Sequence, residues 1–478
     1  MRPNILFICS DQHSFRYTGY AGHPLVQTPN LDQLAERGTV FENAYCGSPV
    51  CVPSRACLMT GMYPSDSNSY CNSTVWDGSH PVWATWLRDS GYTCRAAGKL
   101  DLNDDFDTGF EDVPAGGGHR HHPDITSLFR RPPIYRIGER ETVDGKPRKN
   151  RHSDEKNANA AINFIKSPGD APWVHWVGFN QPHSPFAGLQ EHVDLYPVDD
   201  IDLPAKDPEE IHLVYQALRH FKRVAAPIPE DRIRRARAGY YAMITELDEY
   251  VGRLIDTVET SGQLDNTIVI YTSDHGEMLG EHGLWYKNNL YEDAAHVPLV
   301  VAGPNIPAGA RVIDVISHVD LVATLADWAE ATPSTDLRGL SLSPLLGGSG
   351  QHRGSVYVES HSEGNVTGSH MIRKGDWKYI QFTYYEPLLF NLREDPGETR
   401  NRAGDPDSQP ILRELDLLLR SIVDPEVLTR RAFEAQDCKL AEIAAGKSEK
   451  ELTAILQSRL GPGLARIMAQ ATLSRLQN

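Results

Sequence analysis

The sequence has no long apolar run, and this absence argues against a membrane-spanning chain. No stretch of about 18 consecutive apolar residues occurs among its 478 residues. The apolar run Ile5 to Cys9 is too short for the core of a signal peptide, and no small-residue cleavage site follows it. We therefore expect a soluble protein with no membrane partner, and we place it in the cytoplasm.

Basic residues are too few to favour a large anionic partner. The chain carries 47 Lys and Arg against 64 Asp and Glu, a formal net charge of −17. That balance argues against nucleic acid or an anionic membrane as the main partner. It does not exclude a small anion, because surface charge is screened beyond about 8 Å at physiological salt and a local basic pocket can act alone.

Cysteine is present in an odd number, seven, with no export signal, which argues against a disulfide framework. Most of these thiols are expected to be small buried groups. With 40% hydrophobic and 23% charged residues, the composition is that of an ordinary folded protein. The length allows one large domain with a smaller one, or two to three domains of roughly 150 residues.

The first three hundred residues alternate β-rich runs with helical patterns. This alternation predicts an α/β fold, with a mostly parallel central sheet covered by helices on both faces. The expected strands span residues 4–10, 93–97, 173–179, 267–272 and 298–302. The expected helices include residues 30–37, 83–90, 155–165 and 233–261.

The composition changes near residue 348, which predicts a domain boundary. Short runs at 355–359, 371–373 and 377–382 look like antiparallel strands, with 374–376 as a hairpin turn. We therefore divide the chain into a large domain at 1–349, a small C-terminal α+β domain at 350–425 and a helical tail at 426–478. Apolar residues in the tail recur at helical spacing, so that face must be buried, on its own chain or on a partner. We predict a homodimer or homotetramer in which the tail crosses to a neighbouring subunit.

Polar side chains follow four of the expected strands. Ligands bind beyond the carboxyl ends of the strands in open parallel sheets, so these side chains should gather at one edge. They are Asp11 and Gln12, then Lys99, then Asn180 with His183, and finally Asp274 and His275. Carboxylate and amide oxygens with an imidazole suit a divalent cation such as Ca²⁺ or Mn²⁺.

The segment 48–55, Ser-Pro-Val-Cys-Val-Pro-Ser-Arg, carries the strongest local pattern. Pro53 suits the first turn of a helix and Gly61 its end, which places Cys51 just before the helix N-terminus. Backbone N–H groups and the helix dipole favour an anion there, and Arg55 lies one turn further on. An ordinary buried cysteine beside a capped helix is the alternative, but it leaves Arg55 unexplained.

The run Cys-x-Pro-Ser-Arg followed by Leu-Met-Thr-Gly resembles the signature of the type I sulfatases, within the alkaline phosphatase superfamily. The resemblance extends over most of the chain. It includes Pro-Asn-Ile at 3–5, Thr-Pro-Asn-Leu-Asp at 28–32, Ser-Asp-His-Gly at 273–276, His282, Lys287, Pro-Leu at 298–299, Leu-Phe-Asn-Leu at 389–392 and Asp-Pro at 395–396. In that family a formylglycine-generating enzyme converts the cysteine to formylglycine, so the resemblance implies this modification at Cys51.

The resemblance also implies a role for each matching residue. The implied ligands of one divalent cation, with Ca²⁺ first and Mn²⁺ as the alternative, are Asp11, Gln12, Asp274 and His275, completed by modified Cys51. Residues implied to bind sulfate and move protons are Arg55, Lys99, His183 and Lys287. We take His183 as the general acid for the leaving oxygen, because the unperturbed pKa of histidine lies near working pH.

Two positions depart from the common family pattern. Gln12 stands where most members have an acid, as in the choline sulfatase and phosphonate monoester hydrolase branches. Asp101 stands where many have histidine, and Gly-Lys-Leu-Asp at 98–101 resembles arylsulfatase K, a branch acting on sulfated uronic acids. The loop at 116–122 is a surface loop, a weak second metal site or a specificity loop. We favour the last, with Asp101, His119, His121 and His122 as substrate-binding residues, because cationic side chains there would suit a second anionic group such as a carboxylate.

Sulfate monoester hydrolysis of a small sulfated substrate, such as a sulfated sugar or uronic acid, is the predicted function. One alternative is a phosphonate monoester or phosphodiester hydrolase with the same nucleophile. The other is a non-catalytic binder of a sulfated ligand, against which the intact Cys51, Arg55, Lys99 and Asp274 argue.

Overall fold

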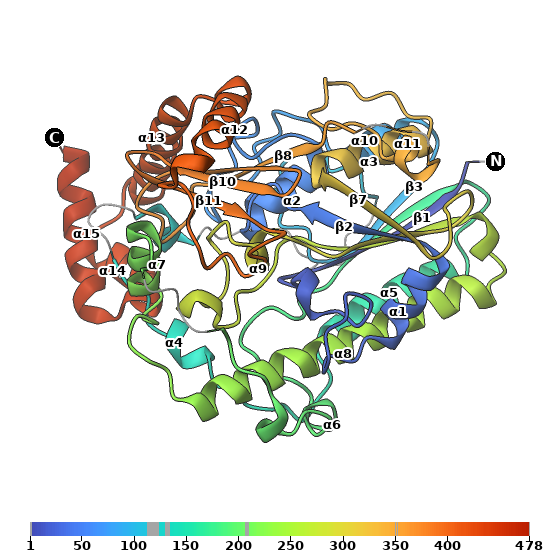
Figure 1. Cartoon of the computed structure of the whole chain (residues 1–478), viewed down its shortest axis with the longest axis horizontal. Helices are drawn as coiled ribbons and strands as arrows, with labels where there is room; N and C mark the ends of the chain where they lie inside the picture. The colour runs from blue at the N-terminus through green and yellow to red at the C-terminus, as the bar shows by residue number, and fades with distance from the viewer. Residues whose placement is uncertain are drawn as a thin grey trace.

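The computed structural model describes residues 2–111, 124–129, 134–205, 210–348, 350 and 352–477. Its centre is a seven-stranded sheet with the order β3-β4-β1-β5-β6-β2-β7 (Figure 1). Only the pairs that include β6 and its two neighbours are antiparallel, so the sheet is mostly parallel, as expected. The strands are β1 (Asn4–Ser10), β2 (Thr39–Tyr45), β3 (Thr93–Gly98), β4 (Trp173–Gly178), β5 (Thr267–Ser273), β6 (Leu299–Ala302) and β7 (Ala310–Ser317).

Helices cover both faces of this sheet, which the alternation along β1 illustrates. Ile5, Phe7 and Cys9 belong to one apolar cluster, together with residues of α2 (Cys51–Thr60), α3 (Trp83–Asp89) and α10 (His318–Trp328). Leu6 and Ile8 point to the opposite cluster, with residues of α1 (Pro29–Arg37), α5 (Asp154–Ile165) and α8 (Glu230–Thr260). A buried parallel strand is apolar on both faces for this reason.

A second, four-stranded antiparallel sheet lies beside the first, in the order β11-β10-β9-β8. Its strands are β8 (Ser355–Ser360), β9 (Ser369–Lys374), β10 (Trp377–Phe382) and β11 (Tyr385–Asn391), and α12 (Gln409–Ile422) packs on it through Leu415 and Leu419. The predicted hairpin turn is confirmed, because Lys374 pairs with Trp377 across Gly375 and Asp376. Strands β2, β7 and β11 are present but were not expected from the sequence.

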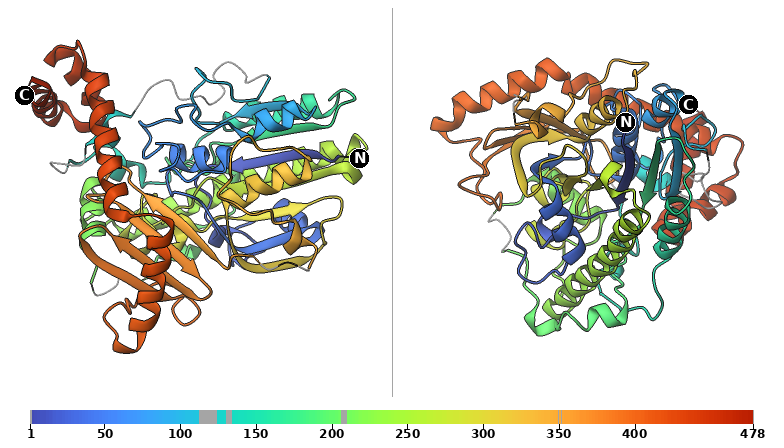
Figure 2. Two further views of the ribbon diagram at one scale, coloured as in Figure 1. Left: turned by 90° about the horizontal axis from the view of Figure 1, so that it is seen from above. Right: turned by 90° about the vertical axis from the view of Figure 1, so that its right-hand side faces the viewer.

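The tail consists of α13 (Pro425–Ala444), α14 (Glu449–Leu460) and α15 (Pro462–Gln477), which project at one end of the molecule (Figure 2). Leu452, Leu456 and Leu460 of α14 are buried in a cluster with Leu128 and with residues of α7 (Leu213–Phe221). Much of the apolar face of the tail is therefore covered by its own chain, while Ile455 and Ile467 remain exposed.

The remaining helical segments are short: α4 (Glu139–Thr142), α6 (Gln190–Val193), α9 (Glu292–Ala295) and α11 (Ser343–Leu346), with 3-10 turns at Phe15–Tyr17, Ile125–Leu128, Val198–Asp200, Leu264–Asn266, Glu281–Gly283 and Pro406–Ser408. None of the described helices combines the length and the apolar character needed to cross a bilayer.

The long helix α8 caps the N-terminus of α1 through Asp248. This buried carboxylate accepts hydrogen bonds from the backbone N–H groups of Asn30 at 3.0 Å and Leu31 at 2.8 Å. Thr28, the N-cap residue of α1, makes no side-chain cap of its own.

We expect Asp248→Ala to lower the free energy of unfolding by about 2 kcal/mol, because buried N–H groups lose a charged acceptor. Denaturant unfolding measures the loss, with exposed Asp256→Ala as control on the same helix; equal stabilities for the two variants would contradict the capping role.

Candidate functional site

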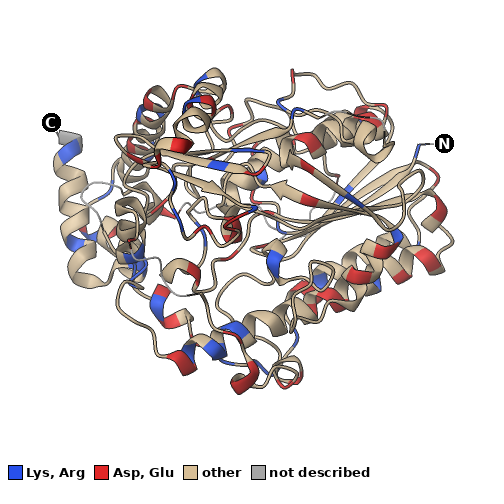
Figure 3. Ribbon diagram, in the orientation of Figure 1, with Lys and Arg blue, Asp and Glu red and all other residues tan. Residues whose placement is uncertain are grey.

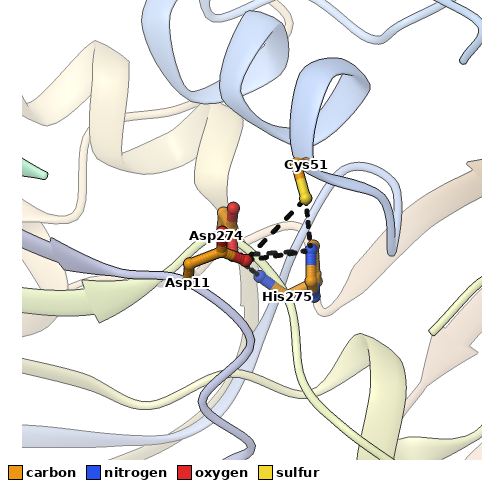
Figure 4. A group of neighbouring side chains, drawn as sticks. All are labelled: Asp11, Cys51, Asp274 and His275. Carbon is orange, nitrogen blue, oxygen red and sulfur yellow. Dashed lines mark hydrogen bonds and ion pairs between the residues drawn. The ribbon is translucent and has the colours of Figure 1, made fainter. Parts of the chain in front are cut away.

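Four side chains that offer metal ligands meet at the carboxyl edge of the central sheet (Figure 4). They are Asp11, Cys51, Asp274 and His275, all buried, with ligand atoms within 4.8 Å of one another. Asp11 follows β1 and Asp274 follows β5, and the last residues of these neighbouring parallel strands, Ser10 and Ser273, are paired in register. The register therefore sets the two carboxylates side by side.

Cys51 reaches this group from the N-terminus of α2. The structure places it as the first residue of the helix rather than just before it, a difference of one position, and Gly61 ends the helix with a φ of 71° as predicted. Its Sγ lies 3.4 Å from His275 Nε2, 3.8 Å from Asp11 Oδ1 and 3.1 Å from Lys287 Nζ. The thiol thus stands at the meeting point of an acid, an imidazole and an ammonium.

Electrostatics at Cys51 favour an anion. Burial and the Asp11 carboxylate act to raise the pKa of the thiol, but Lys287, Lys99 and His275 outweigh them and lower this pKa well below its usual value. By contrast, burial raises the pKa of the Cys57 thiol one and a half turns further along the helix. The neighbouring cationic groups thus distinguish Cys51 from the equally buried Cys57.

Gln12 and Lys287 are held together at the same edge. Lys287 Nζ donates to Gln12 Oε1 at 2.6 Å, while the Gln12 amide nitrogen donates to the Glu277 carboxylate, which fixes which end of the amide faces the cluster. Gln12 has a φ of 74°, and Tyr286 and Asn288 on either side of Lys287 have φ values of 69° and 78°. Such left-handed backbone at non-glycine residues is costly and is typical of functional sites.

The two carboxylates of the cluster have opposite electrostatic surroundings. Burial and the neighbouring Asp11 raise the pKa of Asp274. For Asp11, burial acts to raise the pKa, but Lys99, His183, Lys287 and His275 lower it well below its usual value. Two like charges this close in a buried place call for a cation between them.

Arg55 supports the cluster from behind. It is fully buried, its Nε donates to Asp274 Oδ2 at 2.8 Å, and its other two nitrogens donate to the backbone carbonyls of Lys99 and Ser10 at 2.8 and 3.3 Å. In this arrangement its donors are directed to the protein and not to the cavity described below.

Lys99 follows β3 and enters the cluster from the other side. Its ammonium forms ion pairs with Asp11 and with Asp101 Oδ2, the latter at 3.3 Å. Gly98, with a φ of 80°, allows this approach, because a Cβ there would lie 2.0 Å from the Gly178 carbonyl oxygen on β4. Asp101, expected to bind substrate, forms this ion pair and is not among the described residues that line the cavity.

A cavity of about 1050 Å³ opens above the cluster. Asp11, Gln12, Cys51, Lys99, His183 and Lys287 line its floor and near wall. His183 Nδ1 lies 2.6 Å from the Ser184 carbonyl oxygen and donates its hydrogen there, which leaves Nε2 as the ring nitrogen available for proton exchange. Three predicted metal ligands, Asp11, Gln12 and Cys51, thus line the same cavity as Lys99, His183 and Lys287. The other two predicted ligands, Asp274 and His275, are buried next to Asp11 and Cys51.

Other wall residues were not anticipated from the sequence. Asn72, Arg136, Glu139, Lys222, Glu363 and Arg459 also line the cavity. Their positions follow from long-range packing, and Arg459 belongs to the tail helix α14. Of the residues expected to bind substrate, His119, His121 and His122 lie outside the described part of the chain.

A second buried group, Glu359, His361 and His370, also offers ligand atoms within 4.8 Å of one another. The Glu359 carboxylate already accepts hydrogen bonds from Ser65 N at 2.7 Å, Tyr357 OH at 3.1 Å and His361 Nε2 at 3.2 Å. A hydrogen-bond network inside the second sheet accounts for this group.

Comparison with known proteins decides the family. A family model described as "Sulfatase" matches residues 3–331, and one described as "N-sulphoglucosamine sulphohydrolase, C-terminal" matches residues 280–424. The chain belongs to the sulfatase family. It is therefore a sulfuric ester hydrolase with the fold that the resemblance predicted.

Three relatives of this sulfatase illustrate the match. The choline-sulfatase of Rhizobium meliloti is 34% identical over 85% of this chain and 83% of its own length. Arylsulfatase K of Rattus norvegicus is 32% identical over 88% of this chain and 78% of its own length. Among solved structures, the phosphonate monoester hydrolase of Agrobacterium radiobacter superposes with a TM-score of 0.71 at 26% identity, over 88% of this chain and 96% of its own.

We expect Asp274→Ala to remove the bound cation from this sulfatase, because the predicted ligand set loses one of its two carboxylates and Arg55 loses its partner. Elemental analysis of purified protein should find about one divalent ion per wild-type chain and almost none in the variant. Glu363→Gln is the matched control, since it changes a carboxylate of the same cavity outside the cluster. Equal metal content in all three proteins would place the ion elsewhere.

Proposed function

We propose that the protein hydrolyses a sulfate monoester at a formylglycine made from Cys51, with one divalent cation held by Asp11, Gln12, Asp274 and His275. The observation that carries this proposal is the position of Cys51. It begins a helix at the bottom of a cavity, within contact distance of a lysine, an imidazole and a carboxylate. An inert structural cysteine requires none of these neighbours.

The residues present fit a hard or borderline divalent cation. Two carboxylates and one imidazole converge with Cys51, and the Gln12 amide oxygen lies next to them on Lys287. A positive ion between Asp11 and Asp274 would offset their mutual repulsion. We propose Ca²⁺ as the ion and Mn²⁺ as the alternative. Bound there, the cation would polarise a sulfate oxygen and lower the pKa of the attacking hydroxyl group.

Side chains of the protein would bind the sulfate, protonate the leaving oxygen and position the cluster. Lys99 and Lys287 lie on either side of Cys51 and would bind the sulfate oxygens, since fixed charges aimed at the reacting group supply much of the catalysis. His183, protonated on both ring nitrogens, would give the Nε2 proton to the leaving oxygen and keep the Nδ1 hydrogen on the Ser184 carbonyl oxygen. Arg55 acts as a positioning residue, because it orients Asp274 and closes the site from behind.

Formylglycine is a fitting form of residue 51. Its hydrate would carry two hydroxyl groups on one carbon, one to attack sulfur and the other to lose its proton so that sulfate is released. The maturing partner would be a formylglycine-generating enzyme acting on the 51–55 motif before folding, because Cys51 is 2% exposed in the folded chain.

The substrate that we propose is a small sulfated molecule, a sulfated sugar or uronic acid. The arylsulfatase K relatives and the cationic wall of the cavity support this class. Phosphonate monoester hydrolysis is the second candidate, favoured by the structural likeness at 26% identity. The choline-sulfatase and arylsulfatase K relatives have higher sequence identity to this chain, 34% and 32%, and both are sulfatases.

The cytoplasmic location and the homo-oligomer stay predictions.

We expect protein co-expressed with a formylglycine-generating enzyme to carry an aldehyde at position 51, seen by mass spectrometry of the peptide containing this residue. Cys51→Ser should lose almost all turnover, because serine has no second hydroxyl with which to expel sulfate. The exposed Cys438 gives a matched control, and Cys438→Ser should keep full activity. Full activity in a sample containing only unmodified Cys51 would refute the nucleophile.

We expect kcat/KM for the best sulfate monoester to exceed that for any phosphate monoester or phosphodiester. The reason is the match to sulfatases over most of the chain. Side-by-side kinetics with 4-nitrophenyl sulfate, 4-nitrophenyl phosphate and bis(4-nitrophenyl) phosphate on one matured sample measures the preference. A larger value for the diester would move the protein to the second candidate function.

A further inference from the structure

The outer wall of the cavity is assembled from three segments that are far apart in the sequence. Arg136 N donates to the Phe221 carbonyl oxygen at the end of α7 at 2.9 Å, and Ile137 N donates to the Arg459 carbonyl oxygen of α14 at 2.8 Å. Figure 3 shows basic residues at the end of α7 beside the tail helices. The last turn of α7 and the tail thus border the same cavity as the cluster around Cys51.

The cations of this wall differ in how they are neutralised. Arg136 forms ion pairs with Asp124 at 2.6 Å, Glu139 at 3.4 Å and Glu363 at 3.6 Å, and Arg148 pairs with Glu246. Lys222 has no ion pair or hydrogen bond to its ammonium from the described residues, although only 3% of the residue is exposed. Burial lowers the pKa of this lysine, and the nearby Glu139 only partly offsets the effect.

A buried lysine without a carboxylate partner is costly, so its place calls for an explanation. Its contact inside the protein is the face of Tyr286, whose ring centroid lies 4.9 Å from Nζ. Lys222 also lines the cavity, as do Tyr286 and Lys287, the residue beside Cys51. An anionic group on a molecule bound at Cys51 can therefore meet the ammonium of Lys222.

The surroundings of Tyr286 also argue against a substrate with a quaternary ammonium group. Quaternary ammonium groups bind in cages of aromatic faces. Among the described residues that line the cavity, Tyr286 is the one Phe, Tyr or Trp, and Lys222 already lies over its ring. The segments outside the description, 112–123, 130–133 and 206–209, contain no Phe, Tyr or Trp either.

We propose that Lys222 is the centre of a second anion subsite, which binds a carboxylate or a second sulfate on the molecule whose sulfate ester is cleaved. Arg136 shapes the subsite while its own charge is neutralised, and Arg459 brings further positive charge from the tail. The same arrangement disfavours a cationic alcohol such as choline, although a choline-sulfatase is among the relatives. This inference rests on the proposed function and names the substrate class and the residues that select it.

Binding to a protein that cannot turn over tests the subsite apart from catalysis. The probes are glucose 2-sulfate, glucuronic acid 2-sulfate and glucose 2,6-disulfate, titrated by calorimetry into Cys51→Ala protein loaded with Ca²⁺. We expect at least one doubly anionic probe to bind about tenfold more tightly than glucose 2-sulfate, a difference of about 1.4 kcal/mol. Whether the carboxylate or the second sulfate gains identifies the natural group.

Adding Lys222→Met should remove this preference, whereas Lys222→Arg should keep most of it. The control is Lys439→Met on the exposed face of α13, which should leave the preference unchanged. Equal affinity for all three probes, or a preference that survives Lys222→Met in protein with an unaltered melting temperature, would overturn the subsite. Choline sulfate binding more tightly than glucose 2-sulfate would overturn it as well.

The matured enzyme separates the two proposals. If it cleaves 4-nitrophenyl sulfate but the preference is absent, the subsite is wrong and the proposed function stands. If the calorimetric preference is present but the matured enzyme cleaves none of the sulfate esters, the proposed reaction is wrong and the anion subsite stands.

Discussion

Two carboxylates held side by side in a buried place are the constraint on which the rest of the site depends. Asp11 and Asp274 follow paired ends of adjacent strands, so their repulsion is built into the register of the sheet. Each neighbour offsets part of that repulsion. Arg55 neutralises Asp274 from behind, Lys99 and Lys287 approach from the cavity side, and His275 lies between. Removing Arg55 would leave Asp274 without its paired cation in a buried place, which costs several kcal/mol.

The same constraint is consistent with the position of Cys51 on a helix and not on a strand. A strand end would add another carbonyl-rich edge to an already acidic place. The start of α2 instead presents backbone N–H groups and the positive end of the helix dipole to Cys51, where an anion is to be stabilised. Ser54, one turn along, donates its hydroxyl hydrogen to the Asp274 carbonyl oxygen and so ties the helix to the cluster.

The floor and the outer wall of the cavity are built from different parts of the chain. The floor of the cavity comes from the strand ends and α2, whereas the outer wall comes from residues 134–142, α7 and the tail. A wall made of loops and added helices can change its charge without disturbing the buried cluster. This separation is consistent with relatives named for quite different substrates at similar identity.

The sequence by itself determined the α/β class, the parallel core strands and the identity of the cluster. Polar residues directly after buried strands must gather at one edge, and Cys51 with Gly61 marks a helix by local rules. The sequence did not predict strands β2 and β7, because neither shows a continuous apolar run. Strand β2 carries Glu42 and Asn43 in its middle, and β7 alternates between exposed and less exposed residues at the edge of the sheet. Only the tertiary structure decided that much of the tail packs on its own chain, that Arg55 serves Asp274 and that Asp101 pairs with Lys99. It also decided that Lys222 faces the cavity, because these outcomes depend on contacts between residues far apart in the sequence, whose pairing no local pattern specifies.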